Sequence, residues 1–347
     1  MRGFAGALRG LLLAALLAAS LVLAACGDSD ESDSGSTGEA TAASTQSAST
    51  TEEAAAAPEP ETLKIALYPS TDYAALYAGI EDGTFAQRGL ELEVEQVLTG
   101  TAITAAVTSG DADLGTNSAT AGATGIINGL PIIMVSSADI MPTDGYVEVL
   151  VRTDSGIDSF KDLEGKKVAT INLEGSFELA TLTAVASEGG DPSTVKALAM
   201  APTDEPAALK AGRVDAIVLQ DPFVATAKED PDFKSLGNPF QTFSYPVVSG
   251  GFFASNDTVA KKTDALNRFR EALAEASEKV QADPDIARAT IPTYTELPAE
   301  VADTIGLPVY DTAIPPGAMT SMMEDMKKYG WIDEVPPENE VVWDGQP

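Results

Sequence analysis

Apolar and polar residues follow two alternating periods along the chain. Residues 63–70 (LKIALYPS) alternate between apolar and polar side chains and end in turn-forming residues, which predicts a β-strand. The next segment places Leu76, Ile80 and Phe85 at helical spacing, and residues 90–97 (LELEVEQV) again predict a strand. Because strand and helix alternate in this way, we expect an α/β protein with mostly parallel sheets.

This order of elements occurs twice. In the first unit a helix is predicted to begin at Thr99 or Thr101, to end at Gly110, and to lead into a short strand over residues 112–115. The second unit repeats the order strand, helix and strand over residues 165–176, 177–190 and 195–200.

A short motif marks the repetition. The segments AAVTSGDADLG, from Ala105, and AALKAGRVDAI, from Ala207, both contain Ala-Ala-apolar-x-x-Gly-x-x-Asp. The glycine of each motif is expected to end a helix, and Asp113 and Asp215 are expected to enter the following strand. The repetition predicts two similar lobes.

The segments between and after the units predict how the lobes are connected. Residues 138–156 form a first crossing, and residues 245–257, with paired glycines, form the return. A chain that leaves one lobe, builds a second and comes back is hinged at two strands. The expected domains are lobe 1 over 61–147, lobe 2 over 148–248, and the return to lobe 1 with C-terminal helices over 249–347.

Two packing helices are predicted near the C-terminus. Thr263 is the expected N-cap of the first helix, and Gly330 is the expected end of the second. The methionines of the second helix suit either a binding surface or a core, and we favour the core. The predicted apolar faces are Leu266, Phe269, Leu273 and Val280 in the first helix, and Met319, Met322, Met323 and Met326 in the second.

The N-terminal segment predicts export and lipidation. Two arginines precede the apolar stretch 11–25, which has about fifteen residues where a membrane span needs about twenty. We therefore expect a signal peptide over residues 1–25. Leu23 and two alanines precede Cys26, the one cysteine of the chain, and this matches a bacterial lipobox, in which the thiol is acylated. The alternative is a plain signal peptide followed by an incidental cysteine.

The composition of the remaining chain indicates a disordered tether and disfavours some kinds of partner. Residues 27–60 contain no lysine, arginine or aromatic residue, so we expect residues 26–60 to form the lipidated cysteine and a disordered tether. An acylated Cys26 leaves no thiol for a disulfide, so the core alone must stabilise the exported domain. The formal charge of −32 disfavours a nucleic-acid partner.

Several segments resemble the substrate-binding proteins of ABC importers, in the group for nitrate, sulfonates, taurine and thiamine precursors. The segments GIEDGTFAQRGLELEVE, AAVTSGDADLG and NGLPIIMVSS resemble the first lobe of that group, and DSFKDLEGKKVAT, AALKAGRVDAIVLQDPF and GGFFASND resemble the second lobe and return strand. The resemblance covers residues 63–330. The corner QDPF departs from the Glu-Pro or Trp-Pro that is commoner in the group.

The resemblance implies a two-lobed periplasmic-binding-protein type II fold with a hinge and an interlobe cleft. It implies capture of a small solute and its delivery to an ABC permease with an ATPase subunit. The protein is then expected to be a monomer on the extracytoplasmic face of the bacterial cell membrane, anchored through Cys26, with no cofactor and no metal.

Five loops are expected to form the binding site, because ligands of open α/β sheets bind beyond the carboxyl ends of the strands. These loops supply hydroxyls, amides and helix N-termini. The candidate ligand-binding residues are Tyr68, Ser70, Thr71, Asp72 and Tyr73; Thr99, Gly100 and Thr101; Asn117 and Ser118; Asn172, Glu174, Gly175, Ser176 and Phe177; and Gln220, Asp221 and Phe223.

The charged residues of these loops limit the charge that the solute is expected to carry. No lysine or arginine lies in them, and Asp72, Glu174 and Asp221 would repel a simple anion such as nitrate. A sulfonate with an amine, such as taurine, is slightly favoured, since carboxylates suit its ammonium group and a helix end suits its sulfonate group. The alternative is a thiamine-precursor pyrimidine stacked on Tyr73 or Phe223.

The residue content also bears on whether the protein is an enzyme or a sensor. The chain contains no histidine, and no nucleophile motif or phosphate-binding loop occurs, so we expect no enzyme activity. A bilobal sensor lipoprotein that does not take part in transport stays open as an alternative.

Overall fold

The computed structural model describes residues 60–346. The predicted signal peptide over 1–25, the lipidated Cys26 and the predicted tether up to residue 59 lie outside the described residues. Within residues 60–346, no helix combines the length and apolarity that a membrane crossing requires.

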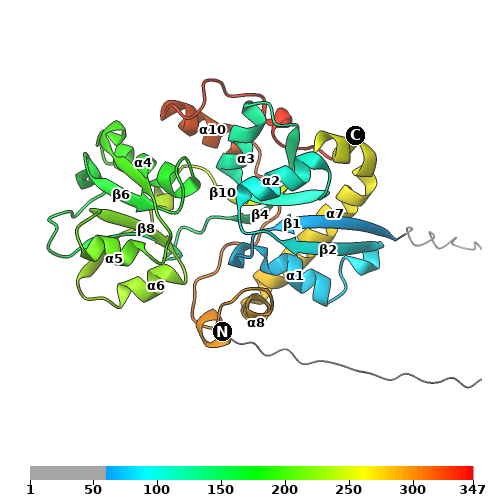
Figure 1. Cartoon of the computed structure of the whole chain (residues 1–347), viewed down its shortest axis with the longest axis horizontal. Helices are drawn as coiled ribbons and strands as arrows, with labels where there is room; N and C mark the ends of the chain where they lie inside the picture. The colour runs from blue at the N-terminus through cyan, green and yellow to red at the C-terminus, as the bar shows by residue number, and fades with distance from the viewer. Residues whose placement is uncertain (1–59, 347) are drawn as a thin grey trace, which may run out of the picture. The chain divides into compact units, whose positions relative to one another are not determined.

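Lobe 1 is built on a five-stranded sheet in the order β2-β1-β3-β10-β4 (Figure 1). β1 is parallel to β2 and β3, while β10 is antiparallel to β3 and β4. The expectation of a mostly parallel sheet therefore holds apart from the return strand. The strands are β1 (Glu61–Leu67), β2 (Leu90–Gln96), β3 (Leu114–Ser118), β4 (Ile132–Ile140) and β10 (Val248–Ser255).

Helices cover both faces of this sheet. Leu76 of α1 and Phe269 of α7 belong to the core on one face, while Ile103 of α2, Ala123 of α3 and Met322 of α10 belong to the core on the other. The helices of lobe 1 are α1 (Ala74–Glu81), α2 (Gly100–Ser109), α3 (Ala119–Ile127), α7 (Asn256–Ala282), α8 (Pro284–Tyr294), α9 (Ala299–Ala302) and α10 (Ala318–Lys328), with short 3-10 helices at Thr71–Tyr73, Ala86–Arg88 and Glu338–Glu340.

Lobe 2 repeats the arrangement with a sheet in the order β7-β6-β8-β5-β9. Here β6 is parallel to β7 and β8, and β5 is antiparallel to β8 and β9. The elements are β5 (Val147–Arg152), β6 (Lys167–Thr170), β7 (Lys196–Ala199), β8 (Ala216–Gln220), β9 (Phe233–Gly237), α4 (Ser176–Ser187), α5 (Glu205–Lys210) and α6 (Phe223–Lys228), with 3-10 helices at Lys161–Leu163, Pro192–Thr194 and Pro239–Thr242.

The repeat motif has the same structural role in both lobes. The carboxylate of Asp113 accepts a hydrogen bond from the backbone N–H of Lys64 at 2.9 Å, and the N–H of Asp113 donates to the carbonyl oxygen of Lys64 at 2.8 Å. Asp215 and Lys167 form the same two bonds in lobe 2, at 2.9 and 2.8 Å. Each aspartate thus joins two neighbouring parallel strands, which confirms the prediction of two similar α/β lobes.

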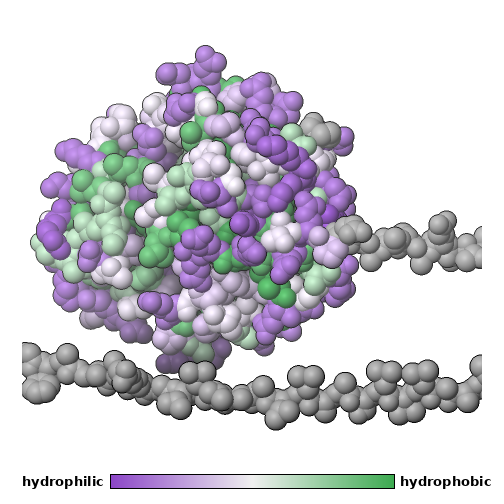
Figure 2. Space-filling view, turned by 45° about the vertical axis from the view of Figure 1, so that its right-hand side comes forward, coloured by the Kyte–Doolittle hydropathy of each residue, from purple (hydrophilic) through white to green (hydrophobic). Residues whose placement is uncertain are grey.

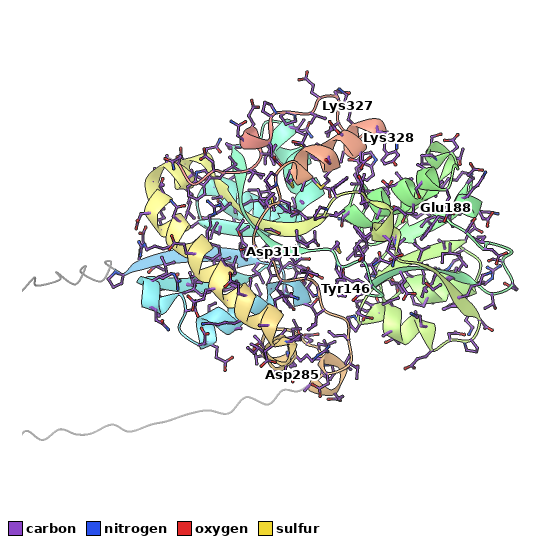
Figure 3. All side chains as sticks on the ribbon, turned by 180° about the vertical axis from the view of Figure 1, so that it is seen from behind. Tyr146, Glu188, Asp285, Asp311, Lys327 and Lys328 are labelled. Atoms are coloured by element: carbon purple, nitrogen blue, oxygen red, sulfur yellow. The ribbon has the colours of Figure 1, made fainter. Side chains whose placement is uncertain are left out.

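Two segments of the chain connect the sheets. The first lies between Ile140, at the end of β4, and Val147, at the start of β5; the second lies between β9 and β10. Tyr146 lies at the junction of the lobes (Figure 3). It is 1% exposed, and its hydroxyl is bonded to Thr71 and Asp72 of lobe 1. The crossing therefore contacts the first loop of lobe 1 directly.

The first C-terminal helix begins earlier than predicted. Ser255 caps α7 by accepting a hydrogen bond from the N–H of Thr258 at 3.0 Å, and the backbone at Lys262 leaves the helical conformation, with a φ of −123°. Thr263 follows this kink and donates its hydroxyl to the carbonyl oxygen of Val259, so it is not the N-cap. The predicted apolar face is buried, as are the four methionines of α10, which confirms their role in the core.

Candidate ligand-binding cleft

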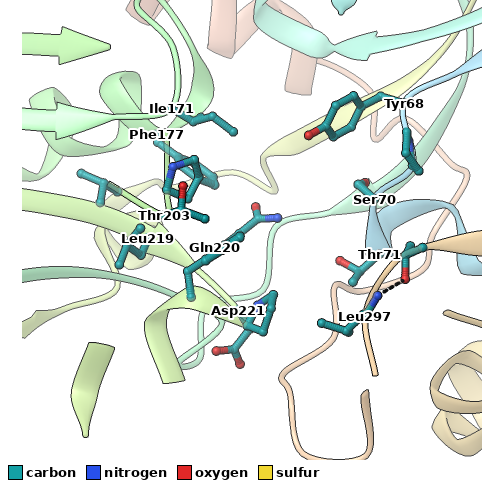
Figure 4. Close-up of a pocket in the computed structure, with 16 residues that line it drawn as sticks. Tyr68, Ser70, Thr71, Ile171, Phe177, Thr203, Leu219, Gln220, Asp221 and Leu297 are labelled. Atoms are coloured by element: carbon teal, nitrogen blue, oxygen red, sulfur yellow. Dashed lines mark hydrogen bonds between the residues drawn. The ribbon is translucent and has the colours of Figure 1, made fainter. Parts of the chain in front are cut away.

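A cleft lies between the two lobes, beyond the carboxyl ends of the parallel strands (Figure 4). It comprises two adjoining cavities of about 370 and 460 Å³. These volumes are within the range of small-molecule sites. The two cavities share the side chains of Tyr68, Ser70, Ile171, Phe177 and Gln220, so we treat them as two subsites of one cleft.

The smaller cavity, here called the apolar subsite, is lined mainly by lobe 2. Tyr68 faces it from lobe 1, opposite Ile171 and Phe177 of lobe 2 (Figure 4). The complete lining is Tyr68, Pro69, Ser70, Thr71, Ile171, Phe177, Pro202, Thr203, Val218, Leu219, Gln220, Asp221, Pro222, Phe223, Thr295 and Leu297.

The larger cavity, here called the polar subsite, is lined mainly by lobe 1. Hydroxyl and amide groups are frequent among its side chains. The complete lining is Tyr68, Ser70, Asp72, Tyr73, Leu98, Gly100, Ile103, Thr116, Asn117, Ser118, Met141, Ile171, Asn172, Ser176, Phe177, Gln220, Ser249 and Gly250. Neither subsite includes a lysine or an arginine among the described residues that line it.

Local caps hold the loops of lobe 1 in place. Ser70 caps the 3-10 helix after β1 by accepting a hydrogen bond from the N–H of Asp72 at 3.3 Å. Ser118 caps α3 by accepting from the N–H of Ala121, also at 3.3 Å. Because each cap lies where a strand gives way to a helix, the loops are fixed at the sheet edge that faces the cleft.

Asp72 is the acidic residue of the polar subsite. Its carboxylate accepts hydrogen bonds from the Ser70 hydroxyl at 2.6 Å and from the Tyr146 hydroxyl at 3.2 Å. Burial raises the pKa of Asp72, although the two hydrogen bonds act in the opposite direction. Asp72 thus lies in a partly dehydrated site with hydroxyl donors and no cationic side chain in the described lining.

A second carboxyl lies behind this subsite. Asp139, on β4, is fully buried, and neither of its carboxyl oxygens has a hydrogen-bond partner among the described residues. Its backbone pairs with Gly250 of β10, which lines the polar subsite. Burial, and then the charge of Asp72, raise the pKa of Asp139 well above its usual range.

Asp221 lines the apolar subsite, but its two oxygens are occupied. One accepts a hydrogen bond from the N–H of Gly306 at 2.6 Å, and the other accepts from the N–H of Ala225 at 3.1 Å. Burial raises the pKa of Asp221, and the two backbone hydrogen bonds oppose that effect. The carboxylate therefore connects lobe 2 to the C-terminal segment, and Figure 4 shows it directed away from Gln220 and Thr203.

The sequence model described as NMT1/THI5 like matches residues 70–287, which include most of both lobes. The chain belongs to the NMT1/THI5-like family. None of the curated proteins matches it significantly.

Solved structures share the fold of this NMT1/THI5-like chain. The periplasmic aliphatic sulphonate-binding protein SsuA from Escherichia coli is 18% identical with a TM-score of 0.67, over 82% of this chain and 93% of that chain. The alkanesulfonate-binding protein SsuA from Xanthomonas axonopodis pv. citri, bound to MOPS, is 20% identical with a TM-score of 0.64, over 82% and 97%. The periplasmic nitrate-binding protein NrtA from Synechocystis PCC 6803 is 14% identical with a TM-score of 0.64, over 80% and 83%. These likenesses establish the two-lobed periplasmic-binding-protein fold.

Most of the residues selected from the sequence meet in the cleft of this NMT1/THI5-like chain. Those that line it are Tyr68, Ser70, Thr71, Asp72, Tyr73, Gly100, Asn117, Ser118, Asn172, Ser176, Phe177, Gln220, Asp221 and Phe223.

Four selected residues lie outside the lining of the described cleft. Thr99 caps α2 by accepting a hydrogen bond from the N–H of Ala102, and Thr101 is exposed in the first turn of the same helix. Glu174 is exposed, with a φ of 55°, and Gly175 is the N-cap of α4. Thr99 and Gly175 thus begin helices, whereas Thr101 and Glu174 lie at the surface.

Several lining residues were missed by sequence reasoning. Thr295 and Leu297 come from the segment after α8, far along the chain from the five loops. Pro202 and Thr203 are the counterparts, by the repeat spacing, of Gly100 and Thr101, so the repetition itself was a signal that could have identified them. No comparable signal marked the two C-terminal residues.

Proposed function

We propose that this chain is the solute-binding component of an ABC importer. The observation that carries the proposal is the cleft itself, whose walls come from both lobes and present amides and hydroxyls to a cavity of small-molecule size. The structures with the same fold are named as binding proteins. The chain has no histidine to serve as a catalytic base, and a binding role rather than an enzymatic one follows.

The proposed mechanism is closure of the lobes around the solute. The chain crosses between the lobes at 141–146 and 238–247, and these two segments are the proposed hinge. Leu98, at the edge of the polar subsite, is 72% exposed, and Leu173 of lobe 2 is 53% exposed. Closure that buried such apolar side chains would favour the solute-bound form, which is the form that a permease would receive.

The solute is proposed to be a small organic molecule. A sulfonate or taurine-like solute, the class first favoured by the sequence, would have to rest on helix N-termini and hydroxyls, because no lysine or arginine occurs among the described residues that line the cleft. The alternative, a heterocyclic amine of the thiamine-precursor type, finds aromatic side chains in Phe177 and Phe223 and amides in Asn117 and Gln220. The lining therefore favours the heterocyclic amine.

The proposed location is the outer face of the cell membrane, with the lipidated Cys26 as anchor. Fractionation of cells that express the natural chain or the Cys26→Ser variant tests this part. The natural chain is expected in the membrane fraction and the variant in the released fraction. Equal distribution of the two would contradict lipid anchoring.

Uptake measurements test transport against sensing. A strain that lacks the chain is expected to lose high-affinity uptake of the solute that binds the purified protein, identified from taurine, alkanesulfonates, nitrate and aminopyrimidines. Binding is read as thermal stabilisation, since a ligand at one hundred times its Kd adds about 2.7 kcal/mol to the free energy of unfolding. Unchanged uptake in the deletion strain would favour the sensor alternative.

A further inference from the structure

The two repeats differ at the positions where they meet the solute. Ile65 of β1 pairs with Leu114 of β3, and Val168 of β6 pairs with Ala216 of β8, so β3 and β8 are equivalent strands. The repeat spacing then makes Leu219 the counterpart of Asn117. At this position the wall from lobe 1 carries a polar side chain and the wall from lobe 2 carries an apolar one.

The preceding position of each strand shows the same difference. Val218 of β8 lines the apolar subsite, and its counterpart Thr116 of β3 lines the polar subsite. Two aromatic rings, Phe177 and Phe223, add to the apolar wall of lobe 2. Because polar side chains are more frequent in one subsite and apolar side chains in the other, the complementary solute has a polar head and an apolar body.

The charge of the polar subsite determines the head. Asp72 is the one charged residue in its described lining. Behind it, the carboxyl group of Asp139 is fully buried, and neither of its oxygens has a hydrogen-bond partner among the described residues. An anionic head would meet Asp72 without a compensating cation in the described lining, whereas a cationic head would pair with the Asp72 carboxylate.

We infer that the solute is an organic cation with an apolar body, its charged nitrogen beside Asp72 in the polar subsite and its body against Phe223 and Leu219 in the apolar subsite. This inference rests on the proposed function, since it assumes that the cleft is the solute site. Hydrophobic residues interrupt the hydrophilic surface toward the middle of the face shown in Figure 2, and hydrophilic residues dominate its periphery.

The test compares probes that differ only in the head group. Calorimetry on the mature protein would measure the Kd of three probes with the same phenylpropyl body: 3-phenylpropylamine, 3-phenylpropan-1-ol and 3-phenylpropane-1-sulfonate. A fourth probe, propylamine, has the amine head but no phenyl ring. The amine is expected to bind at least about tenfold more tightly than the sulfonate, and propylamine is expected to bind more weakly than 3-phenylpropylamine by at least about tenfold.

Two variants assign the subsites. Asp72→Asn, which keeps an acceptor for Tyr146, is expected to weaken the amine at least about tenfold and the alcohol less than about twofold. Phe223→Ala is expected to weaken both probes by a similar factor. Asp257→Asn is the matched control, because it removes the same charge from a side chain that is 88% exposed at the start of α7. It is expected to change neither affinity more than about twofold.

The outcomes separate this inference from the proposed function. If the sulfonate binds as tightly as the amine or more tightly, and Phe223→Ala weakens it, the cleft is a solute site but the cationic head is wrong. If Asp72→Asn weakens amine and alcohol equally, Asp72 is not the counter-ion and the inference is also overturned. If no probe binds but an uptake substrate stabilises the protein, the inference fails and the importer function stands. If neither the probes nor any solute binds, both fail.

Discussion

The carboxylate of Asp221 accepts a hydrogen bond from the backbone N–H of Gly306 at 2.6 Å, and this bond joins lobe 2 to the segment that follows α9. A Cβ atom added to Gly306 would lie 2.8 Å from that carboxylate oxygen, closer than such atoms approach without rearrangement. The Gly306 position is thus fitted to the Asp221 side chain, and the pair forms a defined contact between the two lobes outside the hinge segments.

Gly306→Ala is therefore expected to weaken this contact. The free energy of unfolding should fall by about 1–3 kcal/mol, the usual effect of losing a hydrogen bond to a charged group. Denaturant unfolding measures the change, and Asp221→Ala with the double variant completes a cycle. If the two substitutions have additive effects, Gly306 and Asp221 do not act through their shared hydrogen bond.

A different contact joins lobe 1 to the first hinge segment through Tyr146. Its hydroxyl lies 3.1 Å from the hydroxyl of Thr71 and donates to Asp72 at 3.2 Å. Tyr146→Phe should lower the free energy of unfolding by about 1–2 kcal/mol, because the buried Thr71 hydroxyl loses its partner. The pKa of Asp72 should rise further, because a donor to its ionised form is removed. Carbon NMR of the carboxyl group against pH would measure this shift, and an unchanged or lower pKa would contradict it.

The sequence predicted the framework of the fold because its signals are local. Helix caps such as Gly110, with a φ of 83°, and the buried methionines of α10 follow from composition and spacing over a few residues. The strand predicted over 112–115 instead spans Leu114–Ser118, since Thr116 and its polar neighbours lack the apolar character on which strand prediction depends. These polar residues line the cleft.

The site was less predictable than the fold, for a related reason. The loops after the strands could be located from the α/β order, and most of their selected residues line the cleft. No local pattern marks the Asp221 carboxylate as engaged, whereas in the structure it accepts hydrogen bonds from the N–H of Ala225 and from the N–H of Gly306, 85 residues away. Thr295 and Leu297 were missed for the same reason, because contacts between distant segments leave no local pattern.

Glu205 should make stability depend on pH. It is fully buried at the start of α5, and burial raises the pKa of its carboxyl group to about 8 from 4.5. The folded state therefore holds a proton that the unfolded state releases above about pH 4.5. Its contribution to stability is present at low pH and is lost as the pH rises from about 4.5 toward 8, with a slope of at most about 1.4 kcal/mol per pH unit. Asp139 contributes in the same direction.

Unfolding of the natural chain and of Glu205→Gln across this pH range checks the effect. The free energy of unfolding of the variant should decline less steeply as the pH rises. Near pH 8 the variant should be the more stable of the two, since its amide needs no proton. Glu300→Gln, an exposed change on α9, is the matched control and should follow the natural chain. If the stability of the natural chain rises between pH 5 and 8, the direction of the pH dependence assigned to Glu205 is wrong.

The equivalent aspartates of the two lobes allow a comparison within one molecule. Asp113 and Asp215 bind the backbones of Lys64 and Lys167 in the same way, but Asp113 also forms an ion pair with Lys262 at 2.9 Å. Asp215→Ala is expected to lower the free energy of unfolding by about 1–2 kcal/mol through the lost backbone contact. Asp113→Ala should cost about 0.5–1 kcal/mol more, because the ion pair with Lys262 at the kink of α7 is lost as well.

The ion pair should account for the difference between these two variants. The Lys262→Met variant already lacks the ion pair. In that background, Asp113→Ala should lower the free energy of unfolding by the same amount as Asp215→Ala does in the natural chain. High salt should also reduce the difference in unfolding free energy between Asp113→Ala and Asp215→Ala, because the side chain of Lys262 is 29% exposed and its charge is partly screened. Equal effects of Asp113→Ala and Asp215→Ala in the natural background would mean that the contact with Lys262 adds nothing, and that the repeated backbone bond is the whole contribution of each aspartate.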